Sequence, residues 1–456
     1  MSNLIPSSWI ECNLGDVVTI VRGVTFPASS KVYEPTDGYI ACLRTSHVQE
    51  KLLWNDIYYI PSSYVKSTER LAKRNDILMS MANSSNLVGK VCIKETDRDA
   101  CFGAFLSAIR GEGVSHTYIY YFLKSNDTQQ RLRSSASQTV NIANISVAAL
   151  EKLSLPLPPL TEQTRIAAKI DALLTQVNTL KARIDGIPSL LKRFRQSVLA
   201  AAVSGRLTKN IDESELPPKW QLVNFSTVVN DLRYGTAQKC DYNGGETGVL
   251  RIPNIGDNGI KLKDLKSSRF SPSEINKLAL KRGDVLLIRS NGSVELVGKS
   301  AVVGSREEGL LFAGYLIRIR PNHEKVSAKY INYWLKSPSV RQTIEMTARS
   351  TSGVNNINSE EIKALVFTMP PLSEQNDIVS RVEQLLALAD RLEAKVASAQ
   401  SRIDRLTQGI LAKTFRGELV PQDPNDEPAS VLLERIKAQR AAATNSKRGR
   451  RAATLG

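Results

Sequence analysis

Short polar segments occupy matching places in the two halves of this 456-residue chain. Asn83-Ser84-Ser85-Asn86 in the first half corresponds to Asn291-Gly292-Ser293 in the second. In the same way, Ser137-Gln138-Thr139-Val140-Asn141 corresponds to Ser350-Thr351-Ser352-Gly353. Asn and Gln side chains can form two hydrogen bonds with the edge of adenine, whereas Ser and Thr bind bases less selectively. Because these residues are also common in turns, a purely structural turn remains the alternative for each segment.

Basic side chains also recur at equivalent positions. Arg22 and Arg44 in the first half match Arg233 and Arg251 in the second. Guanidinium groups bind phosphate oxygens, which is the use that we expect for them. We therefore expect each half to carry a surface that binds nucleic acid. Its candidate residues are Arg22, Arg44, His47, Asn83, Ser84, Ser85, Asn86, Lys90, Gln138, Asn141, Arg233, Tyr234, Arg251, Asn254, Arg289, Asn291, Ser293, Lys299 and Ser352.

Catalytic motifs are missing from the sequence. It contains no GxxxxGK(S/T) or GxGxxG phosphate-binding loop and no GxSxG nucleophile turn. An Asn/Asp-Pro-Pro-aromatic motif, typical of methyltransferases that act on base amino groups, is also absent. The five cysteines form no CxxC pair and the three histidines lie far apart, which gives a metal site little support. None of these signatures of catalysis, cofactor binding or metal binding is therefore recognisable in the sequence.

The candidate residues are positioned by a duplication. Pro158-Pro159-Leu160-Thr161-Glu162-Gln163 returns as Pro370-Pro371-Leu372-Ser373-Glu374-Gln375, and each copy opens a long helix with Thr161 or Ser373 as a suitable N-cap. Before each helix, short apolar runs broken by Gly, Asn and Ser predict strands. Shorter helices are expected at about 117–133 and 328–347. The predicted class is α+β.

Both long helices carry apolar residues in alternating steps of four and three, which predicts a coiled-coil seam. The two helices are natural partners, and a pseudo-two-fold relation between the halves makes them antiparallel. Gly186-Ile187-Pro188 predicts a kink in the first helix. The alternative is that each seam packs only on its own domain. The seam residues are Ile166, Ile170, Leu173, Val177, Leu180, Ile184, Leu191, Ile378, Val382, Leu385, Leu392, Val396, Ile403 and Leu406.

A formal net charge of +16 predicts an acidic partner, with nucleic acid as the first candidate and an anionic membrane as the second. The N-terminus lacks the basic and apolar segments of a signal peptide, and no apolar run approaches the roughly 18 residues of a membrane span. The odd number of cysteines fits reduced, buried thiols. We expect a cytoplasmic protein.

Motif, duplication and spacing together resemble the specificity subunit of type I restriction-modification enzymes. The likeness covers about residues 5–420, and the segments Leu191–Gln196 and Ile410–Leu419 resemble the enteric type IA branch of that family. The resemblance implies two pseudo-symmetric globular target recognition domains separated by two long antiparallel coiled-coil helices.

The resemblance also implies a non-catalytic subunit that functions in defence against foreign DNA. Each domain would read one half of a bipartite site in double-stranded DNA, and the helices would set the spacer and dock two methyltransferase subunits. Two restriction and motor subunits would join that core. S-adenosylmethionine, ATP and Mg²⁺ would be bound by these partners, which carry out methylation and restriction.

On this interpretation, residues 1–157 form the first recognition domain, 158–207 the central helix, 208–369 the second recognition domain and 370–420 the C-terminal helix. Residues 421–456 form a tail with a short helix and a basic, disordered end. Two other classes of function stay open. A self-sufficient nuclease or methylase would turn over DNA without partners, and a coiled-coil scaffold on an anionic membrane would float with vesicles.

Overall fold

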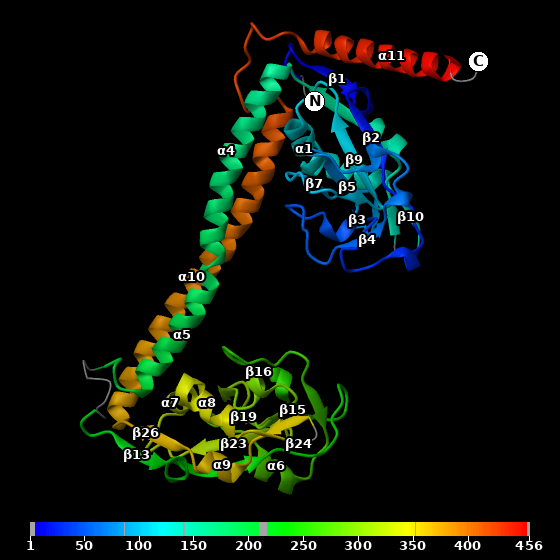
Figure 1. Ribbon diagram of the computed structural model, residues 1–456. Helices are drawn as coiled ribbons and strands as arrows, with labels where there is room; N and C mark the ends of the chain where they lie inside the picture. The colour runs from blue at the N-terminus through cyan, green and yellow to red at the C-terminus, as the bar shows by residue number, and fades with distance from the viewer. Residues whose placement is uncertain (1–4, 86, 140–141, 209–216, 352, 454–456) are drawn as a thin grey trace. The chain divides into compact units, whose positions relative to one another are not determined.

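The computed structural model describes residues 5–85, 87–139, 142–208, 217–351 and 353–453. The chain forms two compact units (Figure 1). Unit 1 consists of Met1–Arg183 together with Ala399–Gly456, and unit 2 consists of Ile184–Ser398. Each unit contains one globular part and a pair of long helical segments.

The globular part of unit 1 is built from small sheets. A four-stranded antiparallel sheet has the order β2-β9-β5-β7, and a three-stranded sheet has the order β4-β3-β8 with β3 and β8 parallel. Two smaller sheets have the orders β10-β11-β6 and β1-β12. The strands are β1 Ile10–Asn13, β2 Val18–Arg22, β3 Tyr39–Leu43, β4 Tyr58–Pro61, β5 Ile77–Ser80, β6 Ala82–Asn83, β7 Val91–Ile93, β8 Cys101–Phe102, β9 Leu106–Gly111, β10 Ser137–Thr139, β11 Ile142–Asn144 and β12 Ser154–Leu157.

Unit 2 repeats all four sheets in the same order and adds a hairpin, β16-β17. The equivalent sheets are β14-β23-β19-β21, β18-β15-β22, β20-β25-β24 and β13-β26. The predicted α+β class and duplicated fold are therefore confirmed. The strands are β13 Gln221–Asn224, β14 Val229–Tyr234, β15 Thr247–Leu250, β16 Ile255–Gly256, β17 Gly259–Ile260, β18 Lys266–Ser268, β19 Val285–Ile288, β20 Ser290–Asn291, β21 Ser300–Val302, β22 Leu311–Phe312, β23 Leu316–Pro321, β24 Arg349–Thr351, β25 Val354–Asn356 and β26 Val366–Met369.

The duplication extends to buried ion pairs. β5 and β19 are fully buried apolar strands, and each follows a buried aspartate. Asp76 accepts two hydrogen bonds from Arg110, both 2.8 Å long, and Asp284 accepts two from Arg320 at 2.8 and 2.7 Å. Two parallel bonds between a guanidinium and a carboxylate fix both side chains and satisfy their polar atoms. The two sheets are thus locked in the same way.

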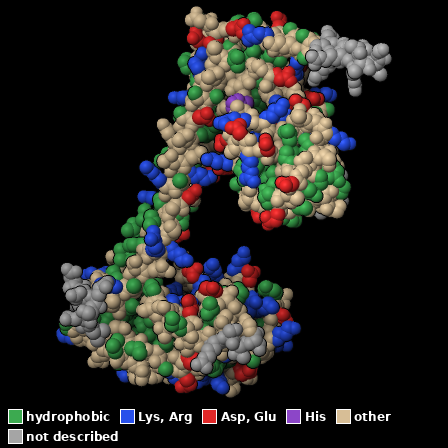
Figure 2. Space-filling view, in the orientation of Figure 1, with side chains coloured by type: hydrophobic (Ala, Val, Ile, Leu, Met, Phe, Trp, Pro, Cys, Tyr) green, Lys and Arg blue, Asp and Glu red, His purple; other side chains and the backbone are tan. Residues whose placement is uncertain are grey.

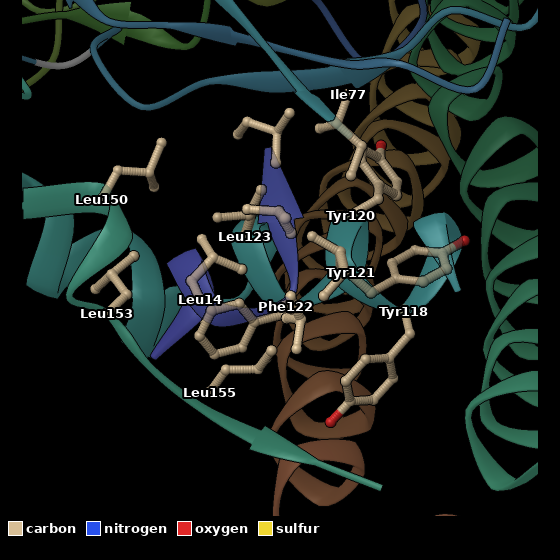
Figure 3. Close-up of a cluster of buried hydrophobic side chains, with 14 of the residues drawn as sticks. Leu14, Ile77, Tyr118, Tyr120, Tyr121, Phe122, Leu123, Leu150, Leu153 and Leu155 are labelled. Carbon is tan, nitrogen blue, oxygen red and sulfur yellow. The ribbon is translucent and has the colours of Figure 1, made fainter. Parts of the chain in front are cut away.

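The core of unit 1 lies between the four-stranded sheet and helices α1 and α3. Figure 3 shows Leu14, Ile77 and Leu155 from three different segments around Leu123 and Phe122 of α1. The shorter helices of unit 1 are α1 His116–Lys124, α2 Asn126–Ser135 and α3 Val147–Glu151, and those of unit 2 are α6 Pro272–Leu278, α7 Ala328–Lys336, α8 Pro338–Thr347 and α9 Ser359–Lys363.

The single helices expected at 117–133 and 328–347 are each two helices, which corrects the sequence prediction. The break falls at Ser125 and at Ser337, both of which have extended backbones. Their buried hydroxyls donate to Phe122 and Trp334 carbonyl oxygens at 2.9 and 2.7 Å. A short hydroxyl side chain competes with the helix backbone for hydrogen bonds in this way.

Three long helices carry the predicted seam: α4 Leu160–Asp185, α5 Ile187–Val203 and α10 Leu372–Phe415. In unit 1, Lys181 of α4 pairs with Asp404 of α10 at 3.7 Å, while Ile166 packs in the same core as Leu411. In unit 2, Arg195 of α5 contacts Asp390 of α10 at 2.6 Å. Residue numbers rise in one helix as they fall in the other, so the predicted antiparallel pairing is confirmed within each unit (Figure 1).

Most predicted seam residues are covered. Ile166, Ile170, Val177, Leu191, Ile378, Val382, Val396 and Ile403 are buried, and Leu173, Ile184 and Leu385 are half-buried. Three leucines are exposed instead, with 49% of Leu180, 40% of Leu392 and 52% of Leu406 accessible, which corrects their assignment as buried positions. A pair of helices covers only a narrow stripe, so leucines at its margin stay in contact with solvent.

The predicted interruption lies at Gly186, between α4 and α5. Gly186 has φ −76° and ψ −22°, which are right-handed helical values, and Pro188 stands in the first turn of α5. The proline removes a backbone donor without forcing the chain out of the helical region. The local backbone therefore agrees with a kink rather than a turn.

Each long helix is attached to its globular part by the glutamine of the repeated motif. Gln163 is fully buried; its Nε2 donates to the Pro158 carbonyl oxygen and its Oε1 accepts from the Ser115 amide, both at 2.9 Å. Gln375 does the same with Pro370 at 2.8 Å and Ser327 at 2.9 Å. One side chain thus joins the first turn of a long helix to the start of α1 or α7.

The helices begin two residues earlier than expected from their caps. α4 starts at Leu160 and α10 at Leu372, because the Pro159 and Pro371 carbonyl oxygens already accept from the Gln163 and Gln375 amides. Thr161 and Ser373 therefore lie inside the first turn and are not N-caps, which corrects the prediction.

The C-terminal segment is more ordered than the sequence suggests. α11 spans Ala429–Ala453, so a helix replaces both the short helix and the disordered end that were expected. Leu432, Leu433 and Ile436 are buried in the core of unit 1. Alanine, arginine, glutamine and lysine dominate this segment, and their high helix propensity explains the extra turns.

We predict that Gln163→Leu loosens the joint between α1 and α4. The change leaves the Ser115 amide and the Pro158 carbonyl without partners, and each buried unsatisfied group costs on the order of 1–3 kcal/mol. Hydrogen exchange in peptides covering 113–124 should accelerate by roughly 5- to 150-fold. Gln176→Leu, on the exposed face of α4, is the matched control. Equal exchange in the two variants would contradict the clamp.

We predict that acid releases the segment that leads into α11. Arg165 binds Asp426 through two hydrogen bonds of 3.1 and 2.6 Å, and Arg165 first and then Thr161 lower the pKa of that carboxyl. This contribution is complete above the ordinary carboxyl pKa and is lost as pH falls through the lowered value. Pepsin cleavage within 421–443, normalised to an unstructured peptide, should be faster in Asp426→Asn than in the parent chain at pH 5. The difference in cleavage rate between the two chains should vanish at pH values below the lowered pKa of Asp426. A difference that does not change with pH would contradict the role of the Arg165–Asp426 pair.

Candidate nucleic-acid interface

Each unit has one pocket at the same place in the fold. Its floor lies where the segment after β2 or β14 meets the turn between β8 and β9 or between β22 and β23. In unit 1, this pocket of about 380 Å³ is formed by the segment after β2, by Arg44 and Tyr58, and by the turn from Gly103 to Leu106. We call it the unit 1 pocket.

The unit 2 pocket is formed by the equivalent elements and has a volume of about 850 Å³. It is lined by the segment after β14, by Arg251 and Arg289, and by the turn from Ala313 to Tyr315. Three of the predicted residues, Tyr234, Arg251 and Arg289, therefore come together there. In the unit 1 pocket, only Arg44 belongs to the predicted set.

A glycine allows the close backbone approach at each floor. Gly23 and Gly235 end the first strand of the two sheets, and a Cβ atom on either would lie 2.1 Å from a carbonyl oxygen, of Gly103 or Phe312. The next residues, Val24 and Thr236, form isolated parallel bridges across the same gap. Glycine is used where two backbones must come this close.

The arginine of each pocket is held from one side. Arg44 Nη2 donates to the Asp56 carbonyl oxygen at 2.8 Å, and Arg251 Nη2 donates to that of Asp264 at 2.7 Å. The Nε atoms of both arginines are buried and have no hydrogen-bond partner among the described residues. In the unit 2 pocket, the Arg289 guanidinium lies 4.5 Å from the Tyr234 ring centroid, which is cation–π geometry. Positive charge is thus fixed at both pockets while donors remain unused.

Two predicted residues are structural. His47 is only 2% exposed and its Nδ1 accepts from the Arg44 amide at 3.1 Å; Asn254 is 1% exposed and its Oδ1 accepts from the Arg251 amide at 2.8 Å. Burial lowers the pKa of His47, so the imidazole is kept neutral. Both side chains close the loop behind the pocket arginine, and their burial does not support their prediction as DNA-binding residues.

Other predicted basic residues have partners away from the pockets. Lys90 donates to Gln49 at 3.1 Å, and Lys299 forms an ion pair with Asp257 at 2.7 Å. Arg233 pairs with Asp231 at 3.3 Å. Arg22 is exposed at the end of β2.

Some residues of the polar segments form turns, as the structural alternative predicted, and others are exposed and could contact a base. Asn83 and Asn291 are half-buried and accept from the nearby amides of Ser84 and Ser293, which is turn chemistry. The Ser84, Ser85 and Ser293 side chains are exposed and available to a ligand. Asn86, Asn141 and Ser352 lie outside the described residues, as does the side chain of Gln138.

Sequence reasoning missed the aromatic rim of the pockets. Phe105 is 64% exposed and Tyr315 is 63% exposed at equivalent positions of the turn. Lys31 in the unit 1 pocket and Lys239 in the unit 2 pocket were also missed. A signal was present, because Phe102-Gly103-Ala104-Phe105-Leu106 matches Phe312-Ala313-Gly314-Tyr315-Leu316.

Charges of both signs occur on the face of each unit that Figure 2 shows. Figure 2 shows Lys and Arg side chains interspersed with Asp and Glu on the visible face. Among the described residues, no group of His, Cys, Asp and Glu could hold a metal ion. Cys12, Cys42, Cys92 and Cys101 are buried free thiols, as predicted, and Cys240 is half-buried. The described helices include none long and apolar enough to cross a membrane.

Comparison with known proteins identifies the family. A family model described as the type I restriction modification DNA specificity domain matches residues 6–189 and again 219–398. The specificity subunit of type I restriction enzyme StySPI from Salmonella potsdam is 35% identical over 98% of this chain and 99% of its own length. That of EcoKI from Escherichia coli (strain K12) is 35% identical over 98% of both chains.

Solved structures show the same fold. A chain from a structure of complex assembly in the type I R-M system has a TM-score of 0.70 at 19% identity, covering 91% of this chain and 99% of its own. The HsdS subunit from Thermoanaerobacter tengcongensis has a TM-score of 0.58 at 19% identity, covering 91% and 98%. With the duplicated match over most of its length, the chain belongs to the family of type I restriction-modification DNA specificity subunits.

Proposed function

We propose that the globular part of each unit reads one half of a bipartite site in double-stranded DNA. The observation that carries this proposal is the pair of equivalent pockets, which share a backbone frame and an arginine but differ in nearly every other lining side chain. A shared frame places both readers in the same way on their half-sites. Different linings give the two halves different sequences to recognise.

The difference in lining is chemical. The unit 1 pocket is largely aromatic and apolar, with Phe26 and Tyr58 5.9 Å apart in edge-to-face contact. The unit 2 pocket also has much apolar surface but carries more polar side chains, with Gln238, Lys266 and Arg289 among its lining residues. Arg and Gln donate to base edges, whereas apolar side chains contact the methyl group of thymine. The exposed Ser84, Ser85 and Ser293 supply further polar contacts near the strands that support each pocket.

The long helices act as the spacer between the two readers and as the dock for two methyltransferase subunits. Two restriction and motor subunits join this core, and S-adenosylmethionine, ATP and Mg²⁺ are bound by the partners. The chain itself is a non-catalytic subunit. It acts in the cytoplasm and directs both methylation and restriction to one DNA target. The sequence motifs for phosphate and cofactor binding, which this chain lacks, are those that the partners supply.

The proposal is tested by co-expressing the chain with its cognate methyltransferase and mapping methylated adenines across the host genome. A split motif with a constant spacer supports two readers on a fixed ruler. A continuous motif, or a stable complex that methylates at no defined motif, overturns the proposal.

We predict that replacing residues 1–157 with the equivalent domain of a relative changes one half of the methylated motif and leaves the other half intact. The reason is that every residue lining the unit 1 pocket lies within 1–157. The same genome-wide map provides the measurement, and replacing residues 208–369 is the reciprocal control. A change in both halves from one exchange would show that the two readers are not independent.

We predict that Arg44→Met and Arg251→Met each weaken DNA binding and reduce its salt dependence by about one unit of slope, because each removes one phosphate contact. Binding of the methyltransferase complex to the mapped duplex, titrated over a range of salt concentrations, gives the slope. Arg74→Met removes an arginine that is 59% exposed, pairs with Asp97 and lies outside both pockets. An equal change of slope in that control would refute the role of the pocket arginines.

A further inference from the structure

We propose that Phe105 and Tyr315 are stacking residues, each of which packs its ring against an unstacked base of its own half-site while Arg44 or Arg251 holds the neighbouring phosphate. The inference rests on the proposed function and deepens it, since it names how each pocket engages DNA. Nucleotide recognition of this kind combines an aromatic face with a fixed cation.

Both rings are exposed on a rigid turn. The Phe105 carbonyl oxygen accepts from the Met81 amide, and the Tyr315 carbonyl oxygen accepts from the Arg289 amide, each at 2.9 Å. The residues that follow, Leu106 and Leu316, are fully buried in the sheet. Each ring is therefore presented to solvent by a backbone that is tied down on both sides, and it can stack without first being ordered.

The pocket beside each ring has the dimensions and walls of a ligand site. Volumes of about 380 and 850 Å³ lie within the range of small-molecule pockets. In the unit 1 pocket, Lys31 Nζ and the Arg44 guanidinium lie 5.1 and 5.6 Å from the centroid of the Tyr58 ring. Aromatic faces and cations thus stand next to each other, which suits a base and its phosphate.

The guanidinium groups of Arg44 and Arg251 have donors without partners, which favours a DNA phosphate bound in each pocket. The Nη2 atoms of Arg44 and Arg251 are bound to backbone carbonyl oxygens, so neither guanidinium is free to turn away. Their Nε atoms are buried without a partner among the described residues. The other terminal nitrogen of each guanidinium, Nη1, has no hydrogen-bond partner among the described residues, and a phosphate oxygen at the pocket would accept a charge-assisted hydrogen bond from it.

A purely apolar contact with another protein would use the same rings differently. It would need a contiguous apolar surface, whereas the surroundings of Tyr315 include Arg251, Lys266 and Gln238. Around Phe105 the surface is more apolar, but Lys31 and Arg44 line the same pocket. These cations favour a nucleotide over an apolar protein surface, and the variants below separate the two.

The test uses the complex with the cognate methyltransferase and the duplex found by methylation mapping. Phe105→Leu and Tyr315→Leu keep apolar volume but remove the aromatic face, and each should weaken specific binding by roughly tenfold. Tyr315→Phe is the matched control and should bind like the parent chain, because it keeps the ring. Assembly with the methyltransferase and affinity for a duplex without the target show whether the variants are folded.

A second readout reports stacking directly. 2-Aminopurine is placed at each adenine of both half-sites except those that are methylated. Binding of the parent complex should change its fluorescence at one position in each half, because the base leaves the duplex stack and meets the ring, and Phe105→Leu and Tyr315→Leu should each alter that signal in a different half. Leucine variants that bind and fluoresce like the parent overturn the stacking role, while a bipartite methylation map in the same experiment leaves the proposed function standing. A parent complex with no bipartite map overturns both.

Discussion

The buried glutamine at the start of each long helix is the contact on which the rest of the structure depends. Gln163 and Gln375 each bind a proline carbonyl within their own motif and the amide that opens α1 or α7. A helix can hold a globular part in a fixed direction only if the joint between them does not rotate. A fully buried side chain with both ends hydrogen-bonded provides that restraint, because breaking it strands polar groups away from water.

A rigid joint explains why the two pockets can differ without loss of the fold. The sheets are fixed by buried strands and by the Asp76–Arg110 and Asp284–Arg320 pairs, where a change of side chain would leave a cavity or an unpaired charge. Rim positions such as Phe105 and Gln238 are exposed, so a change of side chain there leaves no buried cavity. Sequence difference is therefore concentrated where it changes the ligand rather than the core.

The sequence predicted the elements with a strong period and missed contacts that depend on three dimensions. The duplication, the strands around Asp76 and Asp284 and the antiparallel seam follow from motif and spacing. His47 and Asn254 were misplaced because a polar residue in a loop looks the same whether it faces solvent or closes the loop from behind. Phe105 and Tyr315 were missed because an aromatic residue between buried neighbours is read as core, and only the turn geometry shows that the ring points outward.

The two units have equivalent folds, but they differ in which segments of the chain form them. In unit 1, Glu162 accepts from Trp9 at 3.0 Å and from Gln422 at 2.7 Å, so both ends of the chain meet at the start of α4. The equivalent Trp220 has a buried Nε1 with no partner among the described residues. Unit 2 is formed from one continuous stretch, whereas unit 1 needs α11 to cover its core. Because contacts distant in sequence form late, unit 2 can close once residues 184–398 are synthesised, whereas the core of unit 1 also requires residues up to Ile436.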